Sequence, residues 1–121
     1  MAHETQELPS ASWRTYFDDL SRHLGTVEAT VEIDGSDLGA QVQAERLILT
    51  GISYDDRDAV LVISLAEPGS PRDGLEHMVQ QPRRIAVDDA NAILPSAIEA
   101  EDAEGQRTIV ELRAVPELPE Q

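Results

Sequence analysis

His77 is the residue whose type and position best suit chemistry in this sequence. It alternates with Leu75 and Val79, so its side chain is expected on the apolar face of a strand. An imidazole there suits a general base, a metal ligand or a pH sensor. No His-x-His or Glu-x-x-His spacing supplies a partner. A core or rim histidine that is hydrogen-bonded to a backbone carbonyl is therefore the favoured interpretation.

Asp55, Asp56 and Asp58 are the candidate metal ligands. They resemble part of an oxygen-ligand cation loop, but the glycine and the bidentate glutamate of a calcium loop are missing. A solvated turn is favoured, since Asp side chains accept hydrogen bonds from nearby backbone N–H groups. The one basic doublet, Arg83-Arg84, would anchor an anion or an acidic partner, or, as favoured, pair with acids on the sheet.

Composition excludes several other kinds of chemistry. The 121 residues include no Cys and no Lys, which removes thiol nucleophiles, disulfides and Schiff bases. No serine lies in G-x-S-x-G, and no Gly-rich phosphate loop precedes a helix. We expect no cofactor and favour a non-enzymatic protein. A pair of carboxylates meeting in a cleft stays open, because any two of the 24 acids could form one.

The charge balance limits the partners. The 24 acids against 9 Arg give a net charge of -15, which repels phosphate backbones and anionic membranes. Only four residues are aromatic, too few for a platform that stacks single-stranded nucleic acid. Such acidity indicates a solubility device or a high-salt habitat. With no signal peptide pattern, no apolar run of transmembrane length and no Cys, we expect a cytoplasmic protein.

One domain is expected at residues 9–115, between a flexible arm at 1–8 and a flexible Pro/Glu-rich tail at 116–121. It opens with an amphipathic helix at 10–24, with Ser10 or Ser12 as N-cap and Gly25 as C-cap. One face of this helix carries the large apolar residues Trp13, Phe17, Leu20 and Leu24. Packing of this stripe into the core is favoured over docking in a partner's groove.

Short strands fill the rest of the domain. The strongest signal is a central hairpin of 40–53 and 59–66, in which Leu47-Ile48-Leu49 breaks the alternation and suggests a bulge. Residues 67–74 are a loop by composition, and in 89–95 the pair Ile93-Leu94 is expected to tuck under the sheet. The other expected strands are 27–33, 75–79, 85–87 and a last hairpin of 98–100 and 110–114.

These elements predict an α+β, mostly β fold. Loops too short for crossover helices make the connections antiparallel. We therefore expect a small antiparallel β-barrel or barrel-like roll of six to seven short strands, spanning 26–114, with the helix against it.

The order and spacing of several motifs carry a resemblance over roughly residues 9–113. They are Pro9…Trp13…Phe17-Asp18-Asp19, Leu38-Gly39-Ala40-Gln41-Val42, Leu49-Thr50-Gly51-Ile52-Ser53 and His77-Met78-Val79 with Pro82. With them the chain resembles a family of small acidic bacterial proteins of unknown function. The resemblance implies a bacterial, cytoplasmic protein and brings no activity or site residue. Glu104-Gly105 stands where the family is expected to have Asp-Gly.

Three functions stay open. The first is a module that forms a homodimer or binds a protein partner through its sheet edges and helix. The second is a ligand-binding or catalytic barrel, its small-molecule ligand unknown, with His77 and nearby acids at the mouth. The third is a stress or solubility role that depends on the acidic surface.

Overall fold

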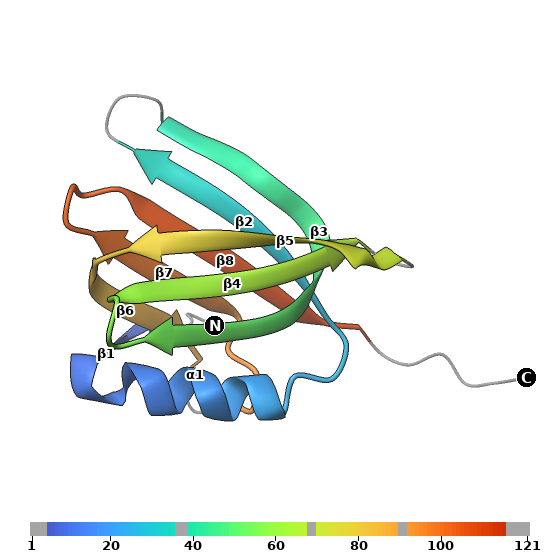
Figure 1. Cartoon of the computed structure of the whole chain (residues 1–121), viewed down its shortest axis with the longest axis horizontal. Coiled ribbons are helices and arrows are strands. Elements are labelled where there is room, and N and C mark those ends of the chain that lie inside the picture. Colours follow the sequence, from blue (N-terminus) through green and yellow to red (C-terminus); the bar gives the residue numbers. More distant parts are fainter. Residues whose placement is uncertain (1–4, 36–38, 68–69, 90–91, 116–121) are drawn as a thin grey trace, which may run out of the picture.

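The computed structural model describes residues 5–35, 39–67, 70–89 and 92–115. In this part of the chain, a short 3-10 turn and one α-helix accompany eight strands that form one antiparallel sheet (Figure 1). The elements, in chain order, are β1 (Thr5–Leu8), η1 (Ser10–Ser12), α1 (Trp13–Arg22), β2 (Val27–Gly35), β3 (Gly39–Asp55), β4 (Val60–Glu67), β5 (Ser70–Gln80), β6 (Pro82–Asp88), β7 (Ala97–Asp102) and β8 (Arg107–Ala114).

The strand order across the sheet is β1-β6-β7-β8-β2-β3-β4-β5. Two runs of consecutive strands, β2 to β5 and β6 to β8, meet where β2 pairs with β8. Because strand twist accumulates, the sheet curls until β4 and β5 pass in front of β7 and β8 (Figure 1). The two ends of the sheet are β1, which pairs with β6 near the start of α1, and β5, which lies in front of β7 and β8 (Figure 1).

The mostly β, antiparallel prediction is confirmed, but the closed barrel is wrong and so is the strand count. The sheet stays open because β5 and β1 do not pair with each other, so that each has only one neighbour. The strands themselves alternate as expected. Val27, Ala29 and Val31 on β2 are fully buried, while Glu28 and Thr30 between them face outward.

The expected bulge lies on both sides of Leu47-Ile48-Leu49. The pairing of β3 with β2 shifts just before this triplet, where Arg46 has a φ of 55°. Its pairing with β4 shifts just after it, between Leu49 and Gly51. These shifts bend the 17-residue strand β3, so that its first half pairs with β2 and its second half with β4.

Helix α1 covers the part of β3 that β2 leaves unpaired. Its apolar residues Trp13, Phe17 and Leu20 are buried in the core, as the sequence predicts. Ser21 Oγ donates to the carbonyl oxygen of Ile52 at 2.6 Å and accepts the Ile52 N–H at 3.1 Å. The helix therefore replaces a neighbouring strand here. The α-helix is shorter than the predicted 10–24, because Ser10–Ser12 form η1 and the C-cap is His23, whose N–H donates to Leu20 O at 3.1 Å. Gly25 lies two residues beyond this cap, with a φ of 59°.

Three segments differ from their predictions. Thr5–Leu8, expected within a flexible arm, form β1, because they pair with β6 and because Leu8 O accepts the Trp13 indole N–H at 3.0 Å. Strand β5 begins at Ser70, inside the expected loop. A Cβ on Gly74 would lie 2.9 Å from the Leu65 carbonyl oxygen, so glycine permits this close pairing. The predicted tail at 116–121 lies outside the described residues.

The pair Ile93-Leu94 is divided between core and solvent. Leu94 packs against the core, whereas Ile93 is 86% exposed. The expectation that both side chains lie under the sheet is therefore wrong for Ile93.

Candidate functional site

His77 lies on β5, opposite Ile63 of β4 and on the inner face of the roll. Exposure decreases along this face of the strand, from Leu75, which is 44% exposed, through half-buried His77 to buried Val79. Burial lowers the pKa of His77 below its ordinary value of 6.5. Within the described residues its ring has no hydrogen-bond partner, so a base or ligand role would need a group that the chain does not supply there.

Of the aspartates in the 55–58 turn, Asp55 stabilises the turn itself and Asp56 pairs with Arg14 of the helix. Asp55 Oδ1 accepts the backbone N–H groups of Arg57 at 2.9 Å and Asp58 at 3.3 Å. Asp56 lies 3.4 Å from an Arg14 guanidinium nitrogen, and both side chains are exposed. The geometry is that of a turn stabilised by its own carboxylate. Over the described ranges, no three acidic or histidine side chains gather as a metal-binding group.

The arginine doublet is divided between solvent and sheet. Arg84 Nε lies 2.8 Å from a Glu7 carboxylate oxygen, which joins β6 to β1 across the outer face. Arg83 is exposed. On the same face, Arg107 lies 2.8 Å from Asp34 and 3.4 Å from Glu99. Arg84 thus pairs with an acidic residue on the sheet, which was the favoured interpretation.

The edge of β5 is the first candidate site. Over the part of the chain that the structure describes, β5 pairs only with β4. Its outer face carries Met78, which is 49% exposed, and its inner face carries the exposed Leu75. Backbone groups along the free side of such a strand offer a ladder to another extended chain.

A pocket of about 400 Å³ lies at the C-terminal end of β5. Met78 to Gln81 form one wall, and the β7–β8 turn from Asp102 to Gln106 forms the other. Asp102 Oδ1 accepts the N–H groups of Glu104 and Gln106, which fixes the turn. His77 is not among the residues that line this pocket. The pocket is mostly polar, and its carboxylates give the end of the β5 edge an acidic wall.

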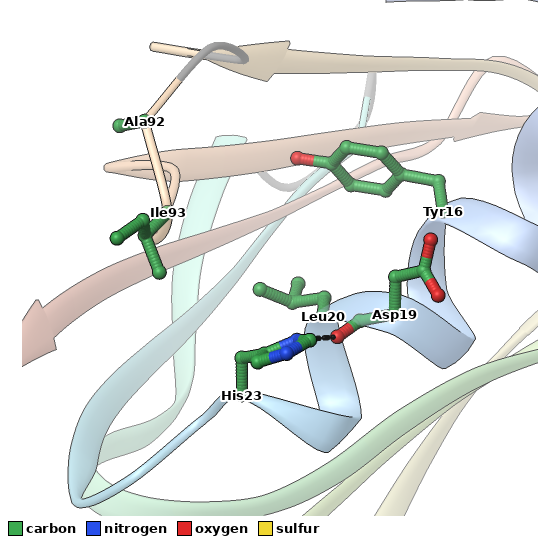
Figure 2. Close-up of a pocket in the computed structure, with 6 residues that line it drawn as sticks. All are labelled: Tyr16, Asp19, Leu20, His23, Ala92 and Ile93. Atoms are coloured by element: carbon green, nitrogen blue, oxygen red, sulfur yellow. Dashed lines mark hydrogen bonds between the residues drawn. The ribbon is translucent and has the colours of Figure 1, made fainter.

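A larger pocket, of about 500 Å³, lies between α1 and the β6–β7 connection (Figure 2). Tyr16, Asp19, Leu20 and His23 line it from the helix, where their spacing of three to four residues places them on neighbouring turns. Ala92 and Ile93 line it from the β6–β7 connection, in which the Ala92 N–H donates to Asp89 O at 3.0 Å. Figure 2 shows the Tyr16 hydroxyl pointing toward this connection.

Sequence reasoning did not find this pocket. It singled out neither Tyr16 nor His23 as a site residue. The i, i+3, i+4 and i+7 spacing of Tyr16, Asp19, Leu20 and His23 was the available signal. The spacing alone does not show that a connection from residues 92–93 forms the opposite wall.

No helix in the described part of the chain is long and apolar enough to cross a lipid bilayer.

Comparisons with known proteins identify the family to which the chain belongs. An uncharacterized protein of the bacterium Aquifex aeolicus is 34% identical over 116 residues, which cover 96% of this chain and 98% of the relative. No solved structure matches. The model of a family of unknown function, DUF5335, matches residues 4–121. The resemblance that the motifs indicated is therefore confirmed, and the chain belongs to the family of unknown function DUF5335.

Proposed function

We propose that the protein is a non-enzymatic interaction module that binds an extended, basic segment of a partner protein along the free edge of β5. The observation that carries this proposal is the bare edge itself, flanked by exposed Leu75 and Met78. Strand addition of this kind uses main-chain hydrogen bonds for affinity and neighbouring side chains for specificity.

Only the first half of β5 carries residues that hinder pairing with another strand. Proteins commonly protect an edge strand with proline, charge or a bulge. Pro71, Arg72 and Asp73 stand in the first half of β5, where its register with β4 also shifts. From Leu75 to Gln80 the only acidic or arginine side chain is Glu76. The second half therefore keeps the features of a pairing edge.

Charge favours a basic partner over a second copy. Glu67 and Glu76 are exposed near the edge, and Asp102 and Glu104 line the pocket at its end. Each chain also carries a net charge of -15, so two copies repel each other, whereas a basic segment is attracted. The absence of cysteine suits the cytoplasm, where we expect this binding to occur.

The test is a titration with a blocked octapeptide of alternating lysine and valine, followed by amide chemical shifts. We expect saturable binding, shifts concentrated on β5, and affinity that falls as salt rises. A peptide of alternating glutamate and valine is the matched control and should not bind. Shifts spread over the whole acidic surface would contradict the proposal. A homodimer that strengthens with salt would also contradict it, in favour of self-association.

Two substitutions sharpen this test. Met78→Lys places a cation beside the edge and should weaken peptide binding about two- to fivefold, the value of one exposed charge interaction. Val42→Lys makes the same kind of change at a residue of β3 that is 56% exposed, and should leave binding unchanged. Equal losses for both variants would show that only net charge matters.

A further inference from the structure

We infer that the pocket between α1 and the β6–β7 connection binds a small amphiphilic amine, with an apolar body and a protonated head. This site is separate from the edge of β5 and does not depend on the function proposed for that edge. Its volume of about 500 Å³ falls within the range of pockets that hold small organic ligands.

The polar groups of the pocket suit a hydrogen-bond donor. His23 Nδ1 lies 2.8 Å from the Asp19 carbonyl oxygen, which can only accept, so Nδ1 carries the hydrogen (Figure 2). In the neutral imidazole, Nε2 is then an acceptor. The Asp19 carboxylate on the same wall accepts as well. An ammonium group, which only donates, can donate to either acceptor.

The Tyr16 hydroxyl completes the polar set. It has no hydrogen-bond partner among the described residues, and burial raises the pKa of Tyr16, so the hydroxyl stays protonated and neutral. It can therefore accept from the ligand without adding charge. The Tyr16 ring is held edge-on against Phe17, with ring centres 5.2 Å apart, which fixes one wall of the pocket.

The remaining lining is apolar and suits the body of such a ligand. Leu20 contributes from the helix, and Ala92 and Ile93 contribute from the connection. Ile93 is 86% exposed, so its side chain is accessible to a ligand. A ligand seated between Tyr16 and Ile93 would remove this surface from water.

The charge of the wall selects against an anion. Asp19 pairs with Arg22 at 3.3 Å, but both side chains are largely exposed, so water screens the pair and Arg22 can turn away. A carboxylate ligand would meet the Asp19 carboxylate and the His23 lone pair. The geometry thus separates an amine from an acid of the same shape.

The experiment compares 4-phenylbutylammonium, 4-phenylbutyrate and 4-phenylbutanol, which share a body and differ in the head group. Each is titrated into the full chain at about pH 8, where an ordinary imidazole is neutral, and amide shifts are recorded. We expect the ammonium to bind saturably, with shifts at Tyr16, His23 and Ile93. It should bind about two- to fivefold more tightly than the other two, by the value of an exposed charge interaction.

Three variants test the assignment. Asp19→Asn should weaken ammonium binding about two- to fivefold, His23→Leu should weaken it similarly, and Ile93→Ser should weaken all three compounds. Glu45→Gln removes an exposed charge on β3 and should change nothing. Binding of the acid or alcohol as tight as that of the amine, shifts elsewhere, or no binding up to the solubility limit would each overturn the inference.

Discussion

Two strand edges in this sheet differ in how they are covered. The second half of β3 loses its neighbour β2 but gains α1, whose Ser21 bonds to both the N–H and the carbonyl of Ile52. Strand β5 pairs with β4 on one side only, and on its other side the described residues place no strand or helix, only the β7–β8 turn near its C-terminal end. This contrast between a covered edge and an unpaired one is the basis of the strand addition proposed for β5. The predictions below test this contrast, first on the covered edge.

The largest effect should come from loosening the helix that covers β3. Phe17 is fully buried between α1 and the sheet, so Phe17→Ala should lower the free energy of unfolding by about 3–5 kcal/mol. Thr15→Ala, an exposed change on the same helix, is the control. Urea unfolding measures both. A loss below about 1 kcal/mol for Phe17→Ala would mean that α1 contributes little to the core.

A smaller loss should follow from removing the two bonds that replace a strand. Ser21→Ala leaves the Ile52 N–H and carbonyl unpaired in a half-buried position, which costs about 1–3 kcal/mol. Hydrogen exchange at the Ile52 amide should accelerate more than at its neighbours. Ser64→Ala is the control, since that hydroxyl makes only a long, exposed bond of 3.5 Å to Glu76. Equal behaviour of the two variants would argue that α1 covers β3 by packing alone.

The half-buried His77 on β5 should make the free energy of unfolding depend on pH. Burial lowers the pKa of His77, so the folded state binds a proton less readily than the unfolded state does. Stability should therefore fall as pH drops below about 6.5 and continue to fall through the lower native pKa. His77→Gln should remove this component, whereas His23→Gln should keep it. Identical pH profiles for the wild type and His77→Gln would show that the imidazole is solvated in the free chain.

The smallest effect on stability should come from the outer face of β5. Met78→Lys should change the free energy of unfolding by less than about 0.5 kcal/mol, because the side chain is half exposed and lies outside the core. Thermal unfolding measures this change. A larger loss would show that Met78 supports the strand in the isolated chain, and its exposure would then say less about a partner.

Local pattern was enough to predict the elements with a repeated apolar period. The stripe of Trp13, Phe17 and Leu20 predicted α1, and alternation predicted the hairpin of β3 and β4. Two segments were predicted wrongly because their composition is that of a loop, whereas their pairing with other strands makes them strands. Thr5–Leu8 are polar save Leu8, and their strand exists only because β6 lies beside them. Proline and glycine masked the start of β5, where an edge tolerates both.

The sites were harder to predict, for a physical reason. Alternation placed His77 on the inner face of its strand, and the register with Ile63 agrees. Nothing in the sequence shows which strand ends the sheet, because that depends on pairings between distant segments. The same holds for the pocket at Tyr16, whose opposite wall comes from residues more than seventy positions away.

The meeting of β2 with β8 has a consequence for how the chain folds. Val27 pairs with Ala114 and Thr5 with Asp88, so these contacts close loops that span most of the domain. Pairings within β2 to β5 and within β6 to β8 join neighbours in sequence and cost less entropy to form. We therefore expect two meanders to assemble early and to dock through β2 and β8 in the slow step. Until that docking, β8 and β2 are bare edges as well, and this is the stage at which the chain is most exposed to aggregation.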